Sequence, residues 1–117
     1  MTQPVHQLKA EFFKTLGHPV RIRILELLLE ADRPVGQLVS EVGVEASHLS
    51  HQLAVLRRAG VVQGRKVGTN IVYSVVDPRI FQLLELARQI LASSLLDAQE
   101  LLANLGSFPF EEGAVTE

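Results

Sequence analysis

The stretch from Ser47 to Val76 contains no aspartate or glutamate, although the whole chain has a formal net charge of −2. Its basic and titratable side chains are His48, His51, Arg57, Arg58, Arg65 and Lys66. A polyanion responds to the local electrostatic field of a protein rather than to its total charge. The residue types of this stretch therefore favour contact with a nucleic-acid backbone.

The first half of this stretch has the pattern of a helix with two unlike faces. At 100° per residue, five side chains fall within about 60° of one line and three leucines cluster on the opposite side. The first set is Ser47, Ser50, His51, Ala54 and Arg58, and the second is Leu49, Leu53 and Leu56. The leucine face must pack against a core. The small, polar face suits a DNA groove, where hydroxyls and His51 can reach base edges.

The second half of the stretch has the pattern of a basic β-hairpin. Arg65 and Lys66 precede Gly68-Thr69-Asn70, a bend that can approach a sugar-phosphate backbone closely. Arg57 and Arg58, at the far end of the helix, are better placed for phosphates than for bases. A solvated helix and a hairpin that is basic for solubility are the alternatives. The combination of a polar helix and a basic hairpin favours DNA.

The surrounding pattern predicts the elements that position these residues. Apolar spacing, prolines and glycines indicate four helices before the hairpin and a long one after it. Their expected extents are Val5 to Gly17, Pro19 to about Glu30, Val35 to Val42, Ala46 to Gly60 and Pro78 to about Leu105. Gly43 would form the tight turn of a helix-turn-helix. We expect a mainly α-helical fold with a small β-hairpin, one domain over 1–106, and a disordered acidic tail over 107–117.

Composition narrows the class of protein. A chain of 117 residues without cysteine has no disulfides or thiolate metal sites. Residues 47–76 hold four basic side chains and no acidic ones, whereas residues 77–117 hold two basic and seven acidic ones. No signal peptide or membrane span is expected, so a cytoplasmic chain is predicted. The sequence has no cysteine nucleophile, no Gly-rich phosphate loop and no Ser-His-Asp pattern, so no enzyme is predicted.

The histidines do not predict a metal site. His48 and His51 are three residues apart on a helix, but no carboxylate or further histidine accompanies them between Ser47 and Val76. Zinc needs three or four converging ligands. We expect no metal and no cofactor, and leave open a histidine site formed across a dimer.

In this order, the motifs resemble the ArsR/SmtB family of winged helix-turn-helix repressors over about residues 8–104. The matching segments begin with Leu16-Gly17-His18-Pro19 and Val35-Gly36-Gln37-Leu38, continue with Ser47-His48-Leu49-Ser50-His51 and Leu56-Arg57-Arg58-Ala59-Gly60, and end with Arg65-Lys66-Val67-Gly68-Thr69 and Tyr73. The resemblance implies a dimeric repressor that binds double-stranded DNA. It assigns Ser47, His48, Ser50 and His51 to the recognition helix, about 46–58. It assigns Arg65, Lys66 and Thr69 to the wing, about 61–76.

The resemblance also implies which signals the chain does not share with its family. A Cys-Val-Cys arsenite site would stand at Pro34-Val35-Gly36, and a zinc site would need ligands where Arg79, Ile90 and Ser93 stand. Asp77 matches that site, but a helix cap explains it. An effector of unknown chemistry, or none, stays open.

The last helix predicts a homodimer. Its apolar residues occur at heptad spacing on two sides, more than one small core can cover. With helix one, the expected dimer contacts are Leu8, Phe12, Leu84, Ala87, Leu91, Ala98 and Leu101. Such a dimer places two recognition helices on an inverted repeat.

The alternative function is a winged-helix protein-interaction module that does not bind DNA.

Overall fold

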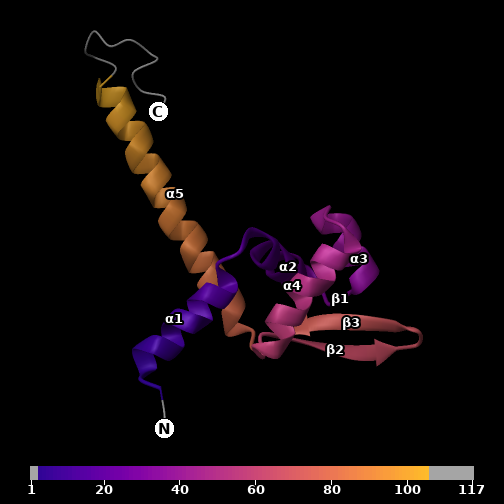
Figure 1. Cartoon of the computed structure of the whole chain (residues 1–117). Helices are drawn as coiled ribbons and strands as arrows, with labels where there is room; N and C mark the ends of the chain where they lie inside the picture. The colour runs from indigo at the N-terminus through magenta and orange to yellow at the C-terminus, as the bar shows by residue number, and fades with distance from the viewer. Residues whose placement is uncertain (1–2, 106–117) are drawn as a thin grey trace. The chain divides into compact units, whose positions relative to one another are not determined.

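The computed structural model of the chain describes residues 3–105. Figure 1 labels its helices and strands in chain order. The chain divides into two compact units, one ending at Phe81 and the other beginning at Gln82. The whole acid-free stretch from Ser47 to Val76 lies in the first unit. Helix α5 (Arg79–Leu105) continues across the boundary, and a single domain over 1–106 stays a prediction.

Four helices precede the hairpin, as expected. They are α1 (Val5–Leu16), α2 (Pro19–Glu30), α3 (Val35–Val42) and α4 (Ala46–Arg58). Pro19 opens α2, where its missing N–H costs nothing. The Nδ1 atom of His18 accepts a hydrogen bond from the N–H of Val20 at 3.1 Å. His18 therefore caps α2, a role that its sequence position near a helix end did not reveal.

Glycines with positive φ precede and follow α4. Gly43 has a φ of 79° and makes the turn between α3 and α4. Gly60 has a φ of 77° and donates to the carbonyl of Arg57 at 3.0 Å, while Val61 donates to that of Leu56 at 2.9 Å. This pair of bonds is a Schellman motif, which satisfies the last carbonyls of a helix. The recognition helix therefore ends where the sequence predicts.

The sheet has three antiparallel strands in the order β1-β3-β2. They are β1 (Arg33–Pro34), β2 (Val62–Val67) and β3 (Asn70–Val75). The sequence predicts only the hairpin, and the structure adds β1, which pairs Arg33 with Tyr73. Two residues are too few to show strand periodicity, and Pro34 suggested only the end of a helix. Proline is tolerated here because β1 is an edge strand.

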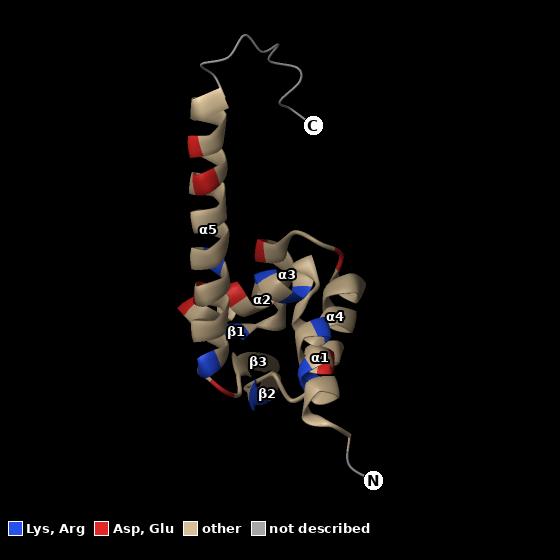
Figure 2. Cartoon of the chain, turned by 90° about the vertical axis from the view of Figure 1, so that its left-hand side faces the viewer, with Lys and Arg blue, Asp and Glu red and all other residues tan. Residues whose placement is uncertain are grey.

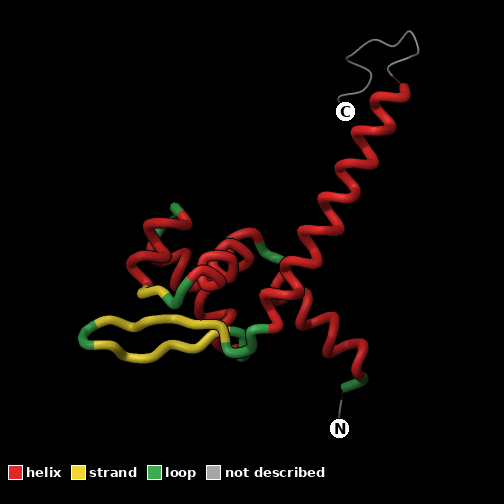
Figure 3. The backbone as a smooth tube through the Cα atoms, turned by 180° about the vertical axis from the view of Figure 1, so that it is seen from behind, coloured by secondary structure: helices red, strands yellow, loops and turns green. Residues whose placement is uncertain are grey.

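The hairpin lies within the expected range, about 61–76. Gly64, Arg65 and Lys66 lie within β2 and pair with β3, and Asn70, which was expected in the bend, is the first residue of β3. The connection is the two-residue turn Gly68-Thr69, and Gly68 has a φ of 63°. A positive φ at the first turn residue is typical of type II′ hairpins. The two strands form an extended ribbon beside the helices of the first unit (Figure 3).

The core of the first unit consists of aliphatic side chains from every helix and from the sheet. Several have no more than 2% of their surface exposed: Ile24, Leu25, Leu27, Leu38, Leu49, Leu53, Leu56 and Val62. Burying such a side chain contributes about 1.5–3 kcal/mol. Each of the helices α2, α3 and α4 supplies at least one of them, so these helices are held in one arrangement.

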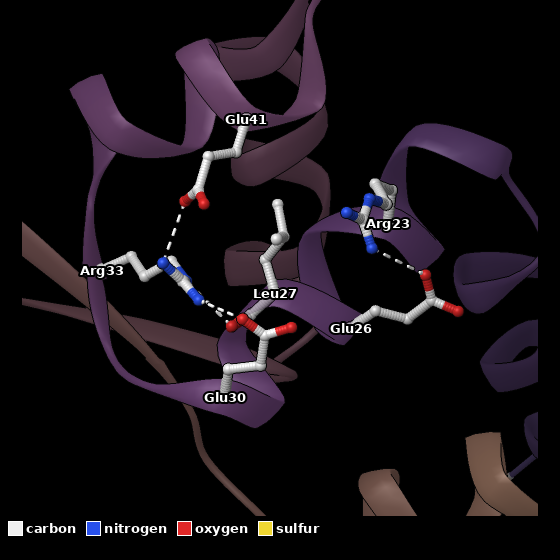
Figure 4. Close-up of polar contacts among 6 residues, drawn as sticks. All are labelled: Arg23, Glu26, Leu27, Glu30, Arg33 and Glu41. Atoms are coloured by element: carbon white, nitrogen blue, oxygen red, sulfur yellow. Dashed lines mark hydrogen bonds and ion pairs between the residues drawn. The ribbon is translucent and has the colours of Figure 1, made fainter.

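A buried arginine joins α2, α3 and the sheet. The Arg33 guanidinium donates to the Leu27 carbonyl at 2.9 Å, to Glu30 at 2.7 Å and to Glu41 at 2.9 Å (Figure 4). Arg33 itself is only 7% exposed. A charge so far out of water must be paired. Arg33 therefore fixes the end of α2 against α3 from within β1.

Helix α5 begins at Arg79, one residue after the expected Pro78. Asp77 accepts from the backbone N–H of Arg79 at 2.9 Å and caps the helix. Hydrogen bonds from the Arg79 side chain lower the pKa of Asp77 to about 2. Among residues 3–105, no helix is long and apolar enough to cross a membrane. The predicted disorder of residues 107–117 lies outside the described residues.

Alanine at Gly36 and alanine at Gly64 should change the free energy of unfolding in opposite directions. Nothing lies within 4 Å of a Cβ added at Gly36 in α3, so Gly36→Ala should stabilise by about 0.4–1 kcal/mol. A Cβ at Gly64 would come within 2.9 Å of Ile71 and 3.1 Å of Tyr73, so Gly64→Ala should destabilise by about 1–3 kcal/mol. Urea denaturation at one protein concentration measures both. A Gly64→Ala variant that unfolds at the same urea concentration as the parent chain would contradict this packing.

Candidate nucleic-acid interface

Helix α4 has the two faces that its sequence predicts. Leu49, Leu53 and Leu56 are at most 2% exposed and pack in the core. On the other side Ser47, Ser50 and His51 are exposed. Because the leucines fix the rotation of the helix about its axis, the small polar residues must face outward.

A hydrogen bond to a buried amide also holds α4, and sequence reasoning missed it. Gln52 is 6% exposed and accepts from the Arg21 guanidinium at 2.7 Å. The same guanidinium donates to the carbonyls of Thr15 at 2.6 Å and Lys14 at 3.4 Å, at the end of α1. Arg21 therefore joins α1 and α4 from its place in α2. A polar amide beside the leucine face was the available signal, because a buried amide needs a partner.

His48 lies on the flank of α4 rather than at the centre of its exposed face. Its ring is 6.3 Å from the ring of His18, at an interplanar angle of 85°. It is still exposed and can be reached by a ligand from solvent. Within residues 3–105, no three His, Cys, Asp or Glu side chains gather into a group that could hold a metal ion.

The end of α4 carries two exposed arginines, Arg57 and Arg58. None of the ion pairs found among the described residues involves them or Lys66. Cations at a helix C-terminus also interact favourably with the helix dipole, which is a structural reason for their presence. They are nonetheless available to an external anion.

The two cations of the wing differ in their surroundings. Successive side chains of a strand point to opposite faces, so Arg65 and Lys66 leave β2 on opposite sides. Arg65 donates to Asp32 at 3.0 Å, a contact that the sequence did not reveal. Lys66 and Thr69 are exposed, and Thr69 lies in the turn. The sequence grouped Arg65 with Lys66, whereas the structure pairs only Arg65 with a carboxylate.

The stretch without Asp or Glu forms two neighbouring elements of the structure. From Ser47 onward α4 carries no Asp or Glu, and neither does the hairpin. Figure 2 colours Lys and Arg blue and Asp and Glu red along the ribbon. Glu45 precedes α4 without a side-chain cap hydrogen bond. A polyanion would thus meet cations and hydroxyls along both elements.

The residues expected at a dimer contact are distributed over α1 and α5. On α1, Leu8 is 48% exposed and Phe12 is 37% exposed. On α5, Leu84 is half-buried and the others are exposed, namely Ala87, Leu91, Ala98 and Leu101. Each helix therefore presents apolar side chains to solvent in the single chain.

Comparison with known proteins identifies the family. The model for "Bacterial regulatory protein, arsR family" matches residues 18–63, from the cap of α2 into β2. The HTH-type transcriptional regulator Rv0081 of Mycobacterium tuberculosis is 56% identical over 105 residues, covering 89% of this chain and 92% of that protein. This chain belongs to the arsR family of bacterial regulatory proteins.

Solved structures agree with the fold of this arsR-family chain. The crystal structure of M. tuberculosis Rv0081 has a TM-score of 0.76 at 59% identity and covers 82% of this chain and 97% of that chain. The homodimeric winged helix-turn-helix DNA-binding domain Mb0332 from Mycobacterium bovis has a TM-score of 0.68 at 27% identity, covering 80% and 85%. The transcriptional repressor BigR from Xylella fastidiosa has a TM-score of 0.64 at 32% identity, covering 76% and 88%. The predicted winged helix-turn-helix fold is confirmed, with α3 and α4 as its helix-turn-helix and β2–β3 as its wing.

Replacing Arg21 with lysine should show how firmly α4 is held. Lysine keeps the charge but loses the planar fork that donates to α1 carbonyls and to Gln52. We expect the free energy of unfolding to fall by about 1–3 kcal/mol. Arg23→Lys, in an exposed pair on the same helix, should change it by less than about 0.5 kcal/mol. Equal urea midpoints for the two variants would contradict the role assigned to Arg21.

Proposed function

We propose that this chain is a DNA-binding transcriptional repressor that acts as a homodimer on an inverted-repeat operator. In each subunit α4 enters the major groove, and the wing contacts the neighbouring backbone. This is the geometry by which helix-turn-helix dimers read two half-sites about one DNA turn apart. The family of the chain and the named repressor among its structural relatives support this function.

One observation carries the proposal: the exposed face of α4 is small, polar and free of acids. Ser47, Ser50 and His51 project from a helix whose other face is locked in the core. Small side chains allow the helix axis to approach the groove floor, and hydroxyl and imidazole groups hydrogen-bond to base edges. We assign these three residues, with His48 on the flank, to base or nearby phosphate contacts.

Phosphate contact is assigned to the exposed cations around α4 and the wing. Arg57 and Arg58 lie at the end of α4, and Lys66 and Thr69 lie near the wing tip. These groups supply the salt-dependent part of the affinity, which positions the protein but does not read sequence. Arg65 belongs to the same surface, although Asp32 engages it in the free chain.

Dimerisation is assigned to the apolar faces of α1 and α5. Leu91 is 63% exposed and Leu101 is 58% exposed, and Leu8 and Phe12 add apolar surface on α1. Apolar patches of this extent are unusual on monomers and mark interaction surfaces. The homodimeric state of the related M. bovis domain supports this assignment.

The remaining parts of the proposal concern the class and location of the protein. We infer a regulator rather than an enzyme, since the family and its relatives are transcriptional regulators. The cytoplasm is the proposed location, because a bacterial regulator of this family acts on chromosomal DNA. No metal or other cofactor is assigned to it.

Two kinds of substitution should separate sequence reading from phosphate contact. Ser50→Ala and His51→Ala should each weaken binding to the operator by about 1–3 kcal/mol and leave random DNA nearly unaffected. Lys66→Gln should weaken both kinds of DNA similarly and lower the salt dependence by about one unit of slope per wing. Fluorescence anisotropy at several salt concentrations measures these effects.

Glu26→Gln provides a control for these titrations, since Glu26 lies in α2 outside the assigned surface. It should leave both affinities unchanged. If Ser50→Ala and His51→Ala bind the operator as the parent chain does, α4 does not read the sequence. A protein-interaction module would bind neither the operator nor random DNA, even at low salt.

A further inference from the structure

Among the described residues, one cation of the assigned DNA surface already has an anionic partner within the chain. The Nη1 atom of Arg65 is 3.0 Å from an Oδ2 atom of Asp32, and both side chains are about half exposed, at 57% and 46%. The two residues are 33 positions apart in sequence and come together only through the fold. No Asp or Glu of the hairpin itself could play this part.

The sheet explains how Asp32 reaches the wing. Val72 of the central strand lies opposite Arg65 in β2 and opposite Pro34 in β1. Asp32 comes directly before β1, so the Arg65 side chain reaches across the middle strand to it. Strand β1, which the sequence did not predict, thus places a carboxylate beside a cation of the wing.

We propose that Asp32 limits the affinity of the wing for DNA by holding the Arg65 guanidinium in an ion pair that competes with phosphate. This inference rests on the proposed function. The Arg65 guanidinium contacts Asp32 through its Nη1 atom, and a phosphate that binds this nitrogen must displace the carboxylate. Lys66, on the other face of β2, has no such partner among the described ion pairs.

The Asp32–Arg65 pair is weak enough for a DNA phosphate to displace it, and having to break it lowers the affinity of the wing for DNA. An exposed ion pair contributes little in water, and salt screens it. A phosphate of the DNA backbone can therefore displace the Asp32 carboxylate, but only at the expense of that pair. A wing with a free Arg65 would bind DNA more tightly and less selectively, since phosphate contacts carry no sequence information.

A purely structural role for the pair makes a different prediction. The contact between Asp32 and Arg65 connects the segment before β1 with β2 across β3, and it could serve only to hold the sheet. In that case its removal would loosen the wing and weaken DNA binding. The sign of the change in affinity therefore separates the two roles.

The test is a double-mutant cycle on the full chain with operator and random duplex DNA. We expect Asp32→Asn to raise the affinity for both duplexes about two- to fivefold per wing. The rise should be absent when Asp32→Asn is combined with Arg65→Gln, because the gain acts through Arg65. Thermal unfolding verifies that each variant is folded, and Asp32→Ser replaces Asp32→Asn if the latter is not.

Glu26→Gln is the matched control, because it also breaks a half-exposed arginine–carboxylate pair and removes one negative charge. The proposal is overturned if Asp32→Asn leaves affinity unchanged or lowers it. It is also overturned if the gain persists without Arg65 or equals that of Glu26→Gln, since either result indicates only a change in total charge. Failure of the parent chain to bind DNA at low salt would instead reject the proposed function itself.

Discussion

The burial of one face of α4 determines what the rest of this chain can present to a partner. Leu49, Leu53 and Leu56 are almost completely removed from water. Rotating the helix to hide its polar face would expose three leucines, at about 1.5–3 kcal/mol each. The outward position of Ser50 and His51 is therefore a consequence of the core, and it needs no bound ligand to maintain it.

Two arginines complete that frame by making contacts that hydrophobic packing does not supply. Arg21 connects the end of α1 to the buried amide of Gln52 in α4, and Arg33 connects α2 to α3 from within β1. Both use the guanidinium fork to satisfy several acceptors at once, which makes them directional where leucine contacts are not. Since α1 also belongs to the proposed dimer surface, Arg21 relates that surface to the orientation of the recognition helix.

Most of the fold could be predicted from the sequence, and what could not be predicted depends on distant residues. The bounds of α4 follow from its leucine spacing and from Gly43 and Gly60, which are local signals. Strand β1 and the pair between Asp32 and Arg65 are different, because each requires that β1 lie beside β3. An acid-free stretch does not leave all its cations unpaired, since Asp32 from outside the stretch engages Arg65. Charge counted along the sequence does not include partners brought in by the fold.

Binding of the unmodified chain to the DNA upstream of its own gene tests the central claim most directly. A gel-shift titration at rising salt, with the stoichiometry of the complex measured, shows whether the chain binds DNA electrostatically and as a dimer. The account predicts one complex of two chains on one duplex, with an affinity that falls steeply as salt increases. Absence of binding at low salt, or binding of single chains that is insensitive to salt, would contradict it.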